Sequence, residues 1–468
     1  MVSKKHIVLI IPRGEAVKNF LYSDTIKVLN VHARVSVLSV VKDQVFVAKF
    51  EKYTEKYIPI DEVKESTHVN RLRSIIYDAH MLWLNSKGGI YHHNMGALRA
   101  KARGRLLFFR IRTFILLLMA NRPSLQLLTN IENRLTYKLR PDDTFLEIFK
   151  ELKPDLVFNT SHIHGPVGEY ASKMAMKLRI PTVGFLFSWD NLFSRSRINI
   201  KYDEYIVWTK KIKKDLMWIY PFINSDKIHI TGTPQFDYHF RDEFIISREE
   251  LAKQIGFDPH RPYILYTTGI ATHVLEEYRH VQSIIDYLNE ANLPQRPQLV
   301  VRTYVKGTSQ EMYDIRDKNY PDVFFPKVEW DEVLYTSAYS DLSVYSSLLR
   351  NTALGINVAS TVMIELFMFN KPAINIAYNP AGSNLSYPKR YSRFIEFEHF
   401  APVAQSGGTV TVHSLEELKK SISEALQDPT KHQREQEAFL KEMFGDTLDG
   451  KSGERVAKVL LKLAGSEI

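Results

Sequence analysis

The sequence predicts an α/β protein with two Rossmann-like, doubly wound domains that face each other across a cleft, and with closing helices at the C-terminus. Apolar runs of about four to eight residues alternate with longer amphipathic segments, which is typical of buried parallel strands joined by helical crossovers. The chain has 468 residues, too many for one ordinary hydrophobic core. A helical segment and a proline-marked loop at 248–262 interrupt the alternation. We therefore expect domains at 1–245 and 246–468.

Each apolar run marks an expected strand. In the first domain these runs are residues 6–11, 35–41, 155–160, 182–187, 204–208 and 227–232. In the second domain they are 263–269, 297–304, 355–360 and 373–378, and the closing helices are expected at 415–426 and 452–465. Open parallel sheets bind ligands at the carboxyl ends of their strands. The chemistry is therefore expected in loops that follow strands.

Composition points to a folded globular enzyme in a reducing compartment. Hydrophobic residues make up 44% of the chain and charged residues 25%. The absence of cysteine excludes a disulfide framework and cysteine-ligated zinc. The opening apolar run is too short for a signal-peptide core, and TFILLLMAN at 113–121 is about half of a bilayer span. We expect a soluble, cytoplasmic protein, with peripheral binding to the inner face of the plasma membrane as a further expectation.

The net charge of +9 is concentrated in one segment. Residues 93–140 contain ten Lys or Arg and one acid, Glu132, whereas the rest of the chain balances. A basic segment beside LLFF and FILLLMA is typical of a helix on an anionic membrane, or of a lid over a phosphate-bearing substrate. Lys101, Arg105 and Arg112 share one helical stripe, and Arg110 falls on the opposite side. A solvated face over a buried stripe is the alternative, and no motif for nucleic-acid binding accompanies the patch.

The stretch GINVASTVMIELFMFNKPAINIAY, 355–378, reads as strand, turn, helix and strand. Ser360 and Thr361 stand where free N–H groups and hydroxyls can seat phosphate oxygens. Glu365 follows on the same helical face, where a carboxylate can accept hydrogen bonds from two sugar hydroxyls. This spacing suits a nucleoside diphosphate. The alternative is a plain helix cap followed by a solvated first-turn acid.

The segment STVMIELFMFNKPAI resembles the carboxyl-half motif of GT-B glycosyltransferases, in which Ser-Thr precedes a helix bearing an acid and a Lys-Pro turn returns to a strand. SWDNLFSR, EYIVWTKKIKKDL and KIHITGTPQFD resemble further motifs of the same group, in that order. Together they look like bacterial surface-polysaccharide transferases, a set that includes the CDP-glycerol polyol-phosphate transferases. The resemblance covers most of 155–378 and the tail FGDTLDGKSGERVA, and less of 1–150. Each motif is loose, and their order and spacing carry the resemblance.

The resemblance implies a division of labour between the domains. The carboxyl-half domain would bind the nucleotide sugar, with Ser360 and Thr361 near the diphosphate and Glu365 near the ribose. The amino-half domain would hold the acceptor. Transfer then needs a base for the acceptor hydroxyl and donors that stabilise the departing diphosphate. No obligatory metal or cofactor is implied, because the nucleotide sugar is itself the donor substrate.

Asp190, in FLFSWDNLFSRSR, follows a strand of the first domain and is the first candidate base. Partial burial beside Trp189 would suit that role. In the polyol-phosphate branch the comparable tryptophan is followed by His, so the Trp-Asp pair disfavours that branch's reaction. The alternative is an Asx turn made by Asp190 and Asn191.

His162 and His164, in NTSHIHGPVGEYA, lie between an expected strand and helix. A His-x-His pair can bind a metal, but no third ligand with suitable spacing accompanies it. We prefer acceptor binding or an alternative base, and a structural role remains open.

Two further loops follow strands of the second domain. In TTGIATH, Gly269 permits a tight turn whose N–H groups could hold phosphate, and His273 could donate to it. A plain connection capped by Thr272 is the alternative. Arg302 and Lys306 could neutralise the leaving diphosphate. Related transferases often carry His-Pro after this Arg, whereas Thr-Tyr stands here, so a surface ion pair is the alternative for Arg302.

These expectations combine into a nucleotide-sugar-dependent glycosyltransferase. The acceptor would be a lipid-linked or growing surface glycan, with docking through residues 93–140 and no nucleic-acid partner. The enzymatic alternatives are a polyol-phosphate transferase and a sugar-nucleotide 2-epimerase, and the non-enzyme alternative is a glycan-binding protein with a decayed site.

Overall fold

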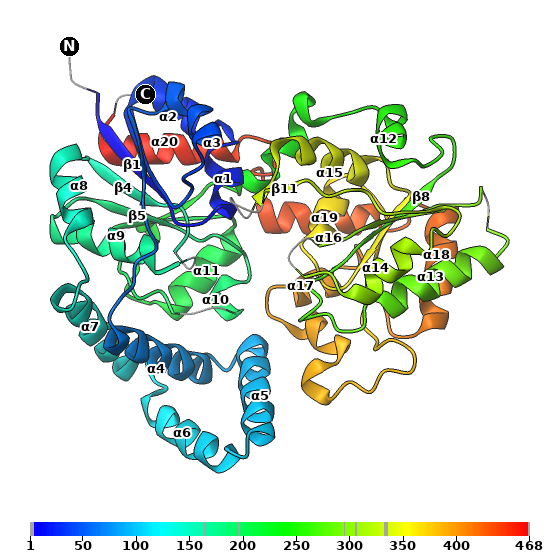
Figure 1. The fold of residues 1–468 in the computed structure, drawn as a ribbon, viewed down its shortest axis with the longest axis horizontal. Helices are drawn as coiled ribbons and strands as arrows, with labels where there is room; N and C mark the ends of the chain where they lie inside the picture. Colours follow the sequence, from blue (N-terminus) through cyan, green and yellow to red (C-terminus); the bar gives the residue numbers. More distant parts are fainter. Residues whose placement is uncertain are drawn as a thin grey trace. The chain divides into compact units, whose positions relative to one another are not determined.

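The computed structural model describes residues 4–162, 165–194, 197–293, 295–304, 307–331 and 336–466. The chain forms two compact units. The first runs to Asp237 and takes up the chain again from Asp446 onward, together with a short stretch after Trp330. The second comprises Tyr238–Trp330 and Ser337–Gly445. Each unit is described by itself below (Figure 1).

The first unit is built on a parallel sheet in the order β3-β2-β1-β4-β5-β6-β7. Its strands are β1 (His6–Ile11), β2 (Arg34–Ser39), β3 (Lys56–Pro59), β4 (Leu156–Asn159), β5 (Thr182–Phe185), β6 (Glu204–Val207) and β7 (Ile228–Ile230). The order reverses at β1, which pairs Ile7 with Val35 on one side and with Leu156 on the other. All six residues of β1 are buried, since helices cover both faces of a doubly wound sheet.

Several helices of the first unit begin at a side chain that caps them. Ser23, Asp43, Asn121 and Thr209 each accept a hydrogen bond from a backbone N–H in the first turn of the following helix. The helices are α1 (Glu15–Phe20), α2 (Asp24–His32), α3 (Gln44–Ala48), α4 (Thr67–Leu84), α5 (Lys87–Ala102), α6 (Leu106–Met119), α7 (Arg122–Lys138), α8 (Thr144–Leu152), α9 (Gly165–Lys177), α10 (Asn191–Ser194), α11 (Lys210–Ile219) and α20 (Ser452–Ala464).

A buried ion cluster ties the α4–α7 helices to α9. Lys173 on α9 is 1% exposed, and its Nζ lies 2.7 and 2.9 Å from the carboxylate oxygens of Glu132 on α7. Arg73 on α4 reaches the same carboxylate at 2.6 Å and Glu169 on α9 at 3.1 Å. Burial by itself would raise the pKa of Glu169, but the charges of Lys173 and Arg73 outweigh it, and the pKa lies below its usual value. Glu132, the one acid of the basic segment, is therefore structural.

The second unit has a parallel sheet in the order β10-β9-β8-β13-β14-β15. Its strands are β8 (Tyr263–Thr267), β9 (Gln298–Arg302), β10 (Val323–Phe324), β13 (Leu354–Asn357), β14 (Ala373–Ile376) and β15 (Val410–Val412). Its helices are α12 (Arg248–Ile255), α13 (Tyr278–Glu290), α14 (Gln310–Asp317), α15 (Tyr339–Asn351), α16 (Val362–Met368), α17 (Ala401–Gln405), α18 (Leu415–Gln427) and α19 (Gln433–Phe444). The order reverses at β8, where Ile264 pairs with Leu299 and with Leu354.

Short elements complete the chain. β11 (Trp330–Asp331) and β12 (Thr336–Ser337) pair with each other. The 3-10 helices are η1 (Glu51–Tyr53), η2 (Ser225–Lys227), η3 (Pro234–Phe240), η4 (Asp242–Phe244), η5 (Tyr387–Lys389) and η6 (Tyr391–Glu396).

At the C-terminus, the two units of the structure differ from the predicted domains. The sequence analysis assigned 246–468 to one domain, but α20 packs on α2 and also contacts β1 and β4 of the first unit. The first helix that was expected to close the second domain, α18, does pack there, against β15. The chain thus returns to its first unit at the end.

Candidate functional site

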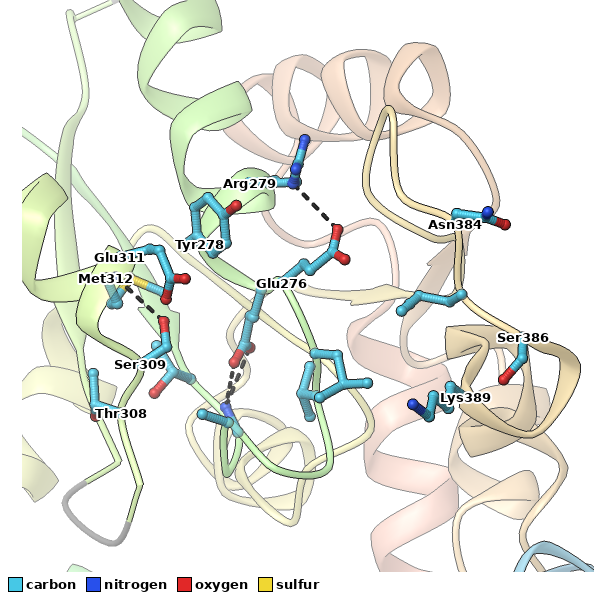
Figure 2. Close-up of a pocket in the computed structure, with 17 residues that line it drawn as sticks. Glu276, Tyr278, Arg279, Thr308, Ser309, Glu311, Met312, Asn384, Ser386 and Lys389 are labelled. Carbon is cyan, nitrogen blue, oxygen red and sulfur yellow. Dashed lines mark hydrogen bonds and ion pairs between the residues drawn. The ribbon is translucent and has the colours of Figure 1, made fainter. Parts of the chain in front are cut away.

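A pocket of about 690 Å³ lies at the carboxyl ends of β8 and β9 in the second unit (Figure 2). Its walls are the β8–α13 loop, the start of α14 and the loop at 384–389 after β14. Parallel sheets place ligands at this edge of the sheet, and a pocket of this volume accommodates a small organic ligand.

Gly269 and Glu277 form the floor of the pocket. The N–H of Gly269 donates to Glu277 Oε2 at 2.9 Å, and the Tyr266 hydroxyl donates to Oε1 at 3.1 Å. A Cβ at Gly269 would lie 2.5 Å from Val274 Cγ2, so only glycine fits this close approach. Burial raises the pKa of Glu277 to about 8, against the lowering effect of the hydrogen bonds from Gly269 and Tyr266. Glu277 can therefore hold or release a proton near neutral pH.

The residue before Glu277 has an unusual backbone. Glu276 has a φ of 60°, in the left-handed region that non-glycine residues rarely adopt. Its carboxylate reaches back over the pocket to Arg279, with Oε2 at 3.2 Å from Nε (Figure 2). Strained backbone of this kind persists where the surrounding contacts enforce it, and it is concentrated at functional sites.

Hydroxyls and one lysine line the pocket from two sides. Figure 2 shows Thr308 and Ser309 at the start of α14 on one side, and Ser386 and Lys389 on the other. Ser309 Oγ also accepts a hydrogen bond from Met312 N at 3.3 Å and so caps α14. Lys389 supplies a cationic group opposite these hydroxyls. Hydroxyls and an ammonium group facing each other suit an anionic, oxygen-rich ligand.

Glu365, expected as an open ribose-binding acid, is only 5% exposed. His239 Nε2 lies 2.8 Å from its Oε1, and the Tyr345 hydroxyl donates to its Oε2 at 2.8 Å. Both carboxylate oxygens are thus engaged inside the second unit. The alternative of a solvated first-turn acid is wrong, because the helix buries this face. Binding of a ribose by Glu365 stays a prediction.

Arg302 and Glu365 belong to the same buried cluster. Arg302 is 9% exposed, its Nη2 lies 2.5 Å from Asp341 Oδ2, and its guanidinium lies over the ring of Tyr345 at 4.8 Å. Tyr345 is also the residue that donates to Glu365. The ion pair considered for Arg302 therefore exists, but it is buried and not on the surface.

Ser360 and Thr361 lie between β13 and α16, as the strand-turn-helix prediction expected. Ser360 Oγ accepts a hydrogen bond from Val362 N at 3.3 Å, so it takes part in the turn itself. Ala359, just before it, has a φ of 41° and donates to Asn375 Oδ1 at 2.8 Å.

The remaining predicted residues of the second unit divide into two groups. Gly269 lies in the pocket, whereas His273 is exposed and does not belong to the pocket lining. The His273 carbonyl accepts a hydrogen bond from Arg393 Nη2 at 2.6 Å. Lys306 lies outside the described residues.

In the first unit, Asp190 and His162 lie at the carboxyl ends of β5 and β4. The carboxylate of Asp190 accepts hydrogen bonds from Ser194 Oγ at 2.6 Å and from Asn191 Nδ2 at 3.2 Å, so it stabilises the turn that opens α10. His162 Nδ1 lies 3.1 Å from the carbonyl oxygen of Phe185. His164 lies outside the described residues.

Two segments that carry the GT-B resemblance meet in the first unit. Asp237, the last residue of KIHITGTPQFD, accepts hydrogen bonds from Ser452 N at 3.1 Å and Gly453 N at 2.7 Å, at the start of α20. Arg455 Nε donates to the Thr231 carbonyl at 2.8 Å. Burial raises the pKa of Asp237 to about 6, although the amides of Gly453 and Ser452 oppose this. These motifs thus serve to dock α20.

Sequence reasoning missed Glu277 and Lys389. Glu277 reads in sequence as an ordinary acid ahead of an amphipathic helix. A paired Glu-Glu shortly after the glycine of a strand-to-helix loop was the available signal. Lys389 follows a loop without any motif, so no local pattern marks it.

The described residues show neither a metal site nor a membrane-spanning helix. No group of three or more His, Asp or Glu side chains in this part of the chain is arranged to hold a metal ion. Within the same residues, no helix combines the length and the apolar character that crossing a bilayer requires.

Comparison with known proteins identifies solved structures of the same fold. No protein-family model and no curated protein sequence matches the chain. UDP-GlcNAc 2-epimerase from Methanocaldococcus jannaschii is similar with a TM-score of 0.55 and 15% identity, over 98% of this chain and 99% of that one. UDP-GlcNAc 2-epimerase from Neisseria meningitidis bound to UDP-GlcNAc has a TM-score of 0.55 and 12% identity, over 98% and 100% of the two chains. A glycosyltransferase from Rickettsia africae ESF-5 has a TM-score of 0.51 and 12% identity, over 98% and 99%.

These likenesses span nearly the whole length of every chain compared. They agree with the two parallel-sheet units of this chain. The predicted fold class, GT-B with two Rossmann-like doubly wound units, is confirmed.

Proposed function

We propose that the chain is an enzyme that acts on a nucleotide-activated sugar, and that its second unit binds this substrate in the pocket above Glu277. The observation that carries the proposal is the 690 Å³ pocket with a buried, protonatable carboxyl in its floor. The pocket lies at the sheet edge where parallel α/β units bind nucleotides. The similarity to solved sugar-nucleotide enzymes adds support.

In this proposal the two sides of the pocket hold the diphosphate. Lys389 neutralises part of its charge, and Ser309 donates a hydrogen bond to its oxygens. The Thr308 hydroxyl donates to the Tyr304 carbonyl at 2.7 Å and so supports the loop beside the ligand. Ser360 and Thr361 do not line this pocket and remain a separate proposed phosphate seat at the end of β13. Glu365 and Arg302 do not line this pocket, and in this proposal they stabilise the second unit around Tyr345.

The reaction that we favour is 2-epimerisation of the sugar, an alternative at the sequence level. A base takes the proton from C2, and the electron pair of that C–H bond forms a C1–C2 double bond and expels the nucleoside diphosphate from C1. The diphosphate then adds back to C1 while a proton is delivered to the opposite face of C2, which leaves C2 inverted. A carboxyl whose pKa is raised to about 8 can accept and return a proton at neutral pH. The epimerases among the solved structures of this fold support our preference for epimerisation over glycosyl transfer.

Glycosyl transfer to a lipid-linked or growing glycan is the second candidate. It is favoured by the GT-B motifs in the sequence and by the basic helices α5 and α6, which suit a membrane-borne acceptor. Asp190, His162 and His164 would then serve the acceptor. Polyol-phosphate transfer stays disfavoured by the Trp-Asp pair.

Binding is tested first, by thermal shift with UDP-, GDP-, CMP-, CDP- and dTDP-sugars. A ligand at about 100 times its Kd should stabilise the protein by about 3 kcal/mol. Lys389→Ala should weaken binding about tenfold, whereas Lys327→Ala, an exposed lysine of the same unit, should not. No shift with any donor would reject the proposal and favour a non-enzymatic glycan-binding protein.

The reaction is tested by incubating the binding nucleotide sugar in D2O without acceptor. Epimerisation should introduce deuterium at C2, which mass spectrometry detects. Glu277→Gln should abolish this exchange, and Glu311→Gln, an exposed acid at the same pocket, should retain it. Release of nucleoside diphosphate only when a glycan is added, with no deuterium uptake, would identify a transferase instead.

A further inference from the structure

The outward side of helix α6 is apolar. Seven of its fourteen residues are large hydrophobic side chains with exposed fractions between 47% and 72%: Leu107, Phe108, Ile111, Phe114, Ile115, Leu117 and Leu118. They recur at spacings of three and four residues and therefore share one face of the helix. α6 lies at the outer end of the α4–α7 group of the first unit (Figure 1).

The opposite side of α6 carries the contacts with its neighbours. Leu116 is 4% exposed and packs with Ala79 of α4 and Leu125 of α7. Arg112 forms an ion pair with Asp78 of α4. His93 of α5 lies 3.2 Å from Thr113 Oγ1. Arg112 and Thr113 of α6 thus face its neighbours while seven large apolar side chains face outward, which is unusual for a surface helix.

The surroundings of this face are strongly basic. Residues 87–131 contain eight Lys or Arg and no Asp or Glu. Seven of the eight are exposed: Lys87, Arg99, Lys101, Arg103, Arg105, Arg110 and Arg122. Two copies of such a segment would repel each other, which argues against a second copy of the chain as the partner. An anionic surface with an apolar interior complements both properties.

We propose that the α5–α6 helices dock the protein on an anionic phospholipid membrane. The outward face of α6 lies among the acyl chains near the headgroups, and the cations at the α5–α6 junction and Arg110 contact lipid phosphates. Arg112, which the sequence grouped with the docking residues, is instead held by Asp78. The proposal is independent of which reaction the second unit catalyses.

The test measures co-flotation of the full chain with vesicles. The vesicles are phosphatidylcholine alone, or phosphatidylcholine with about one-third phosphatidylglycerol. The first variant is Phe114→Ser with Leu118→Ser, whose side chains are 64% and 67% exposed, so the substitutions leave the interior intact. Its matched control is Val31→Ser with Val45→Ser, which are 63% and 71% exposed in the same unit but lie on α2 and α3.

The protein should float with anionic vesicles and not with phosphatidylcholine alone. The Phe114/Leu118 variant should bind the anionic vesicles at least about tenfold more weakly, because two apolar side chains that insert into the membrane are lost. The Val31/Val45 variant should bind them like the parent. Arg103→Glu with Arg110→Glu should abolish the preference for anionic lipid, and Lys49→Glu with Lys64→Glu should not. Raising NaCl from about 0.1 M to about 0.5 M should weaken binding.

Equal partitioning of the parent and the Phe114/Leu118 variant would overturn the proposal, as would absence of vesicle binding. Light scattering of the parent and the variant measures their oligomeric state as a further test. A dimer that the Phe114/Leu118 variant converts to a monomer would mean that a second copy covers the face, which also overturns the proposal. None of these measurements involves a nucleotide, so their failure is separate from failure of the proposed function.

Discussion

Replacing Glu277 by Gln should make the protein more stable, and by an amount that grows with pH. The carboxyl is 5% exposed and accepts hydrogen bonds from Gly269 N and the Tyr266 hydroxyl. A glutamine oxygen can accept the same bond from Gly269. The substitution thus keeps the shape of the pocket floor and removes the ionisation.

The size of the effect follows from the raised pKa. In the unfolded chain the carboxyl loses its proton near its ordinary pKa of 4.5, whereas in the folded protein it keeps the proton until about pH 8. Between these values the folded state binds more protons, so stability falls as pH rises. At about 1.4 kcal/mol per pKa unit the loss reaches roughly 4–5 kcal/mol by pH 8. The Glu277→Gln variant does not lose this stability, because glutamine does not ionise.

The assay is thermal unfolding of the parent and the variant from pH 5 to pH 8.5. The difference in Tm should be small at pH 5 and rise to roughly 10 °C at pH 8.5, since about 1 kcal/mol shifts Tm by 2–4 °C in domains of this size. Glu311→Gln should show a constant difference, because this acid is exposed. A pH-independent difference for Glu277→Gln would refute the reasoning, since it would mean that the carboxyl ionises as readily folded as unfolded.

Three further substitutions probe buried groups. Lys173→Met should lower the free energy of unfolding, measured by urea titration, by roughly 3–5 kcal/mol, because it leaves buried carboxylates without their cationic partner. Lys177→Met, at an exposed position of the same helix, should change it by less than about 0.5 kcal/mol. Asp237→Ala removes the acceptor for two amides of α20 and should cost about 1–2 kcal/mol, with faster proteolysis at the C-terminal helix; unchanged proteolysis would contradict the docking role. Glu365→Ala should lower Tm, because the Tyr345 hydroxyl loses its acceptor, while Kd for the nucleotide, measured by calorimetry well below Tm, changes less than about threefold. A large loss of nucleotide affinity at unchanged Tm would mean that Glu365 binds the ribose.

The sequence predicted the repetitive parts of the fold well. The run at 6–11 coincides with β1, and the strand expected at 373–378 begins where β14 begins. Such strands are recognisable because burial on both faces makes them continuously apolar. In the two large sheets, β3, β10 and β15 were not predicted. β3 is an edge strand with half-exposed residues, and β10 and β15 are edge strands of two and three residues, so none of them carries that signal.

The site was less predictable because its chemistry depends on burial. Glu365 was placed on the correct helix, but the tyrosine and histidine that enclose it come from other elements. Glu277 acquires its raised pKa from the strand and loop beneath it, which no local pattern reveals. Spacing along a chain predicts which element bears a side chain, and the tertiary structure determines what surrounds it.

The return of α20 to the first unit constrains how this protein is made. β1 leaves the ribosome before the second unit is synthesised, whereas α20, one of the helices that covers its sheet, leaves after it. The surface of α2 that α20 covers therefore stays uncovered while the entire second unit is synthesised and can fold. A stop codon near residue 445 would deprive the early unit of its final helix while sparing the later one. Isolating the first unit for study requires that residues 446–466 be spliced directly after Asp237.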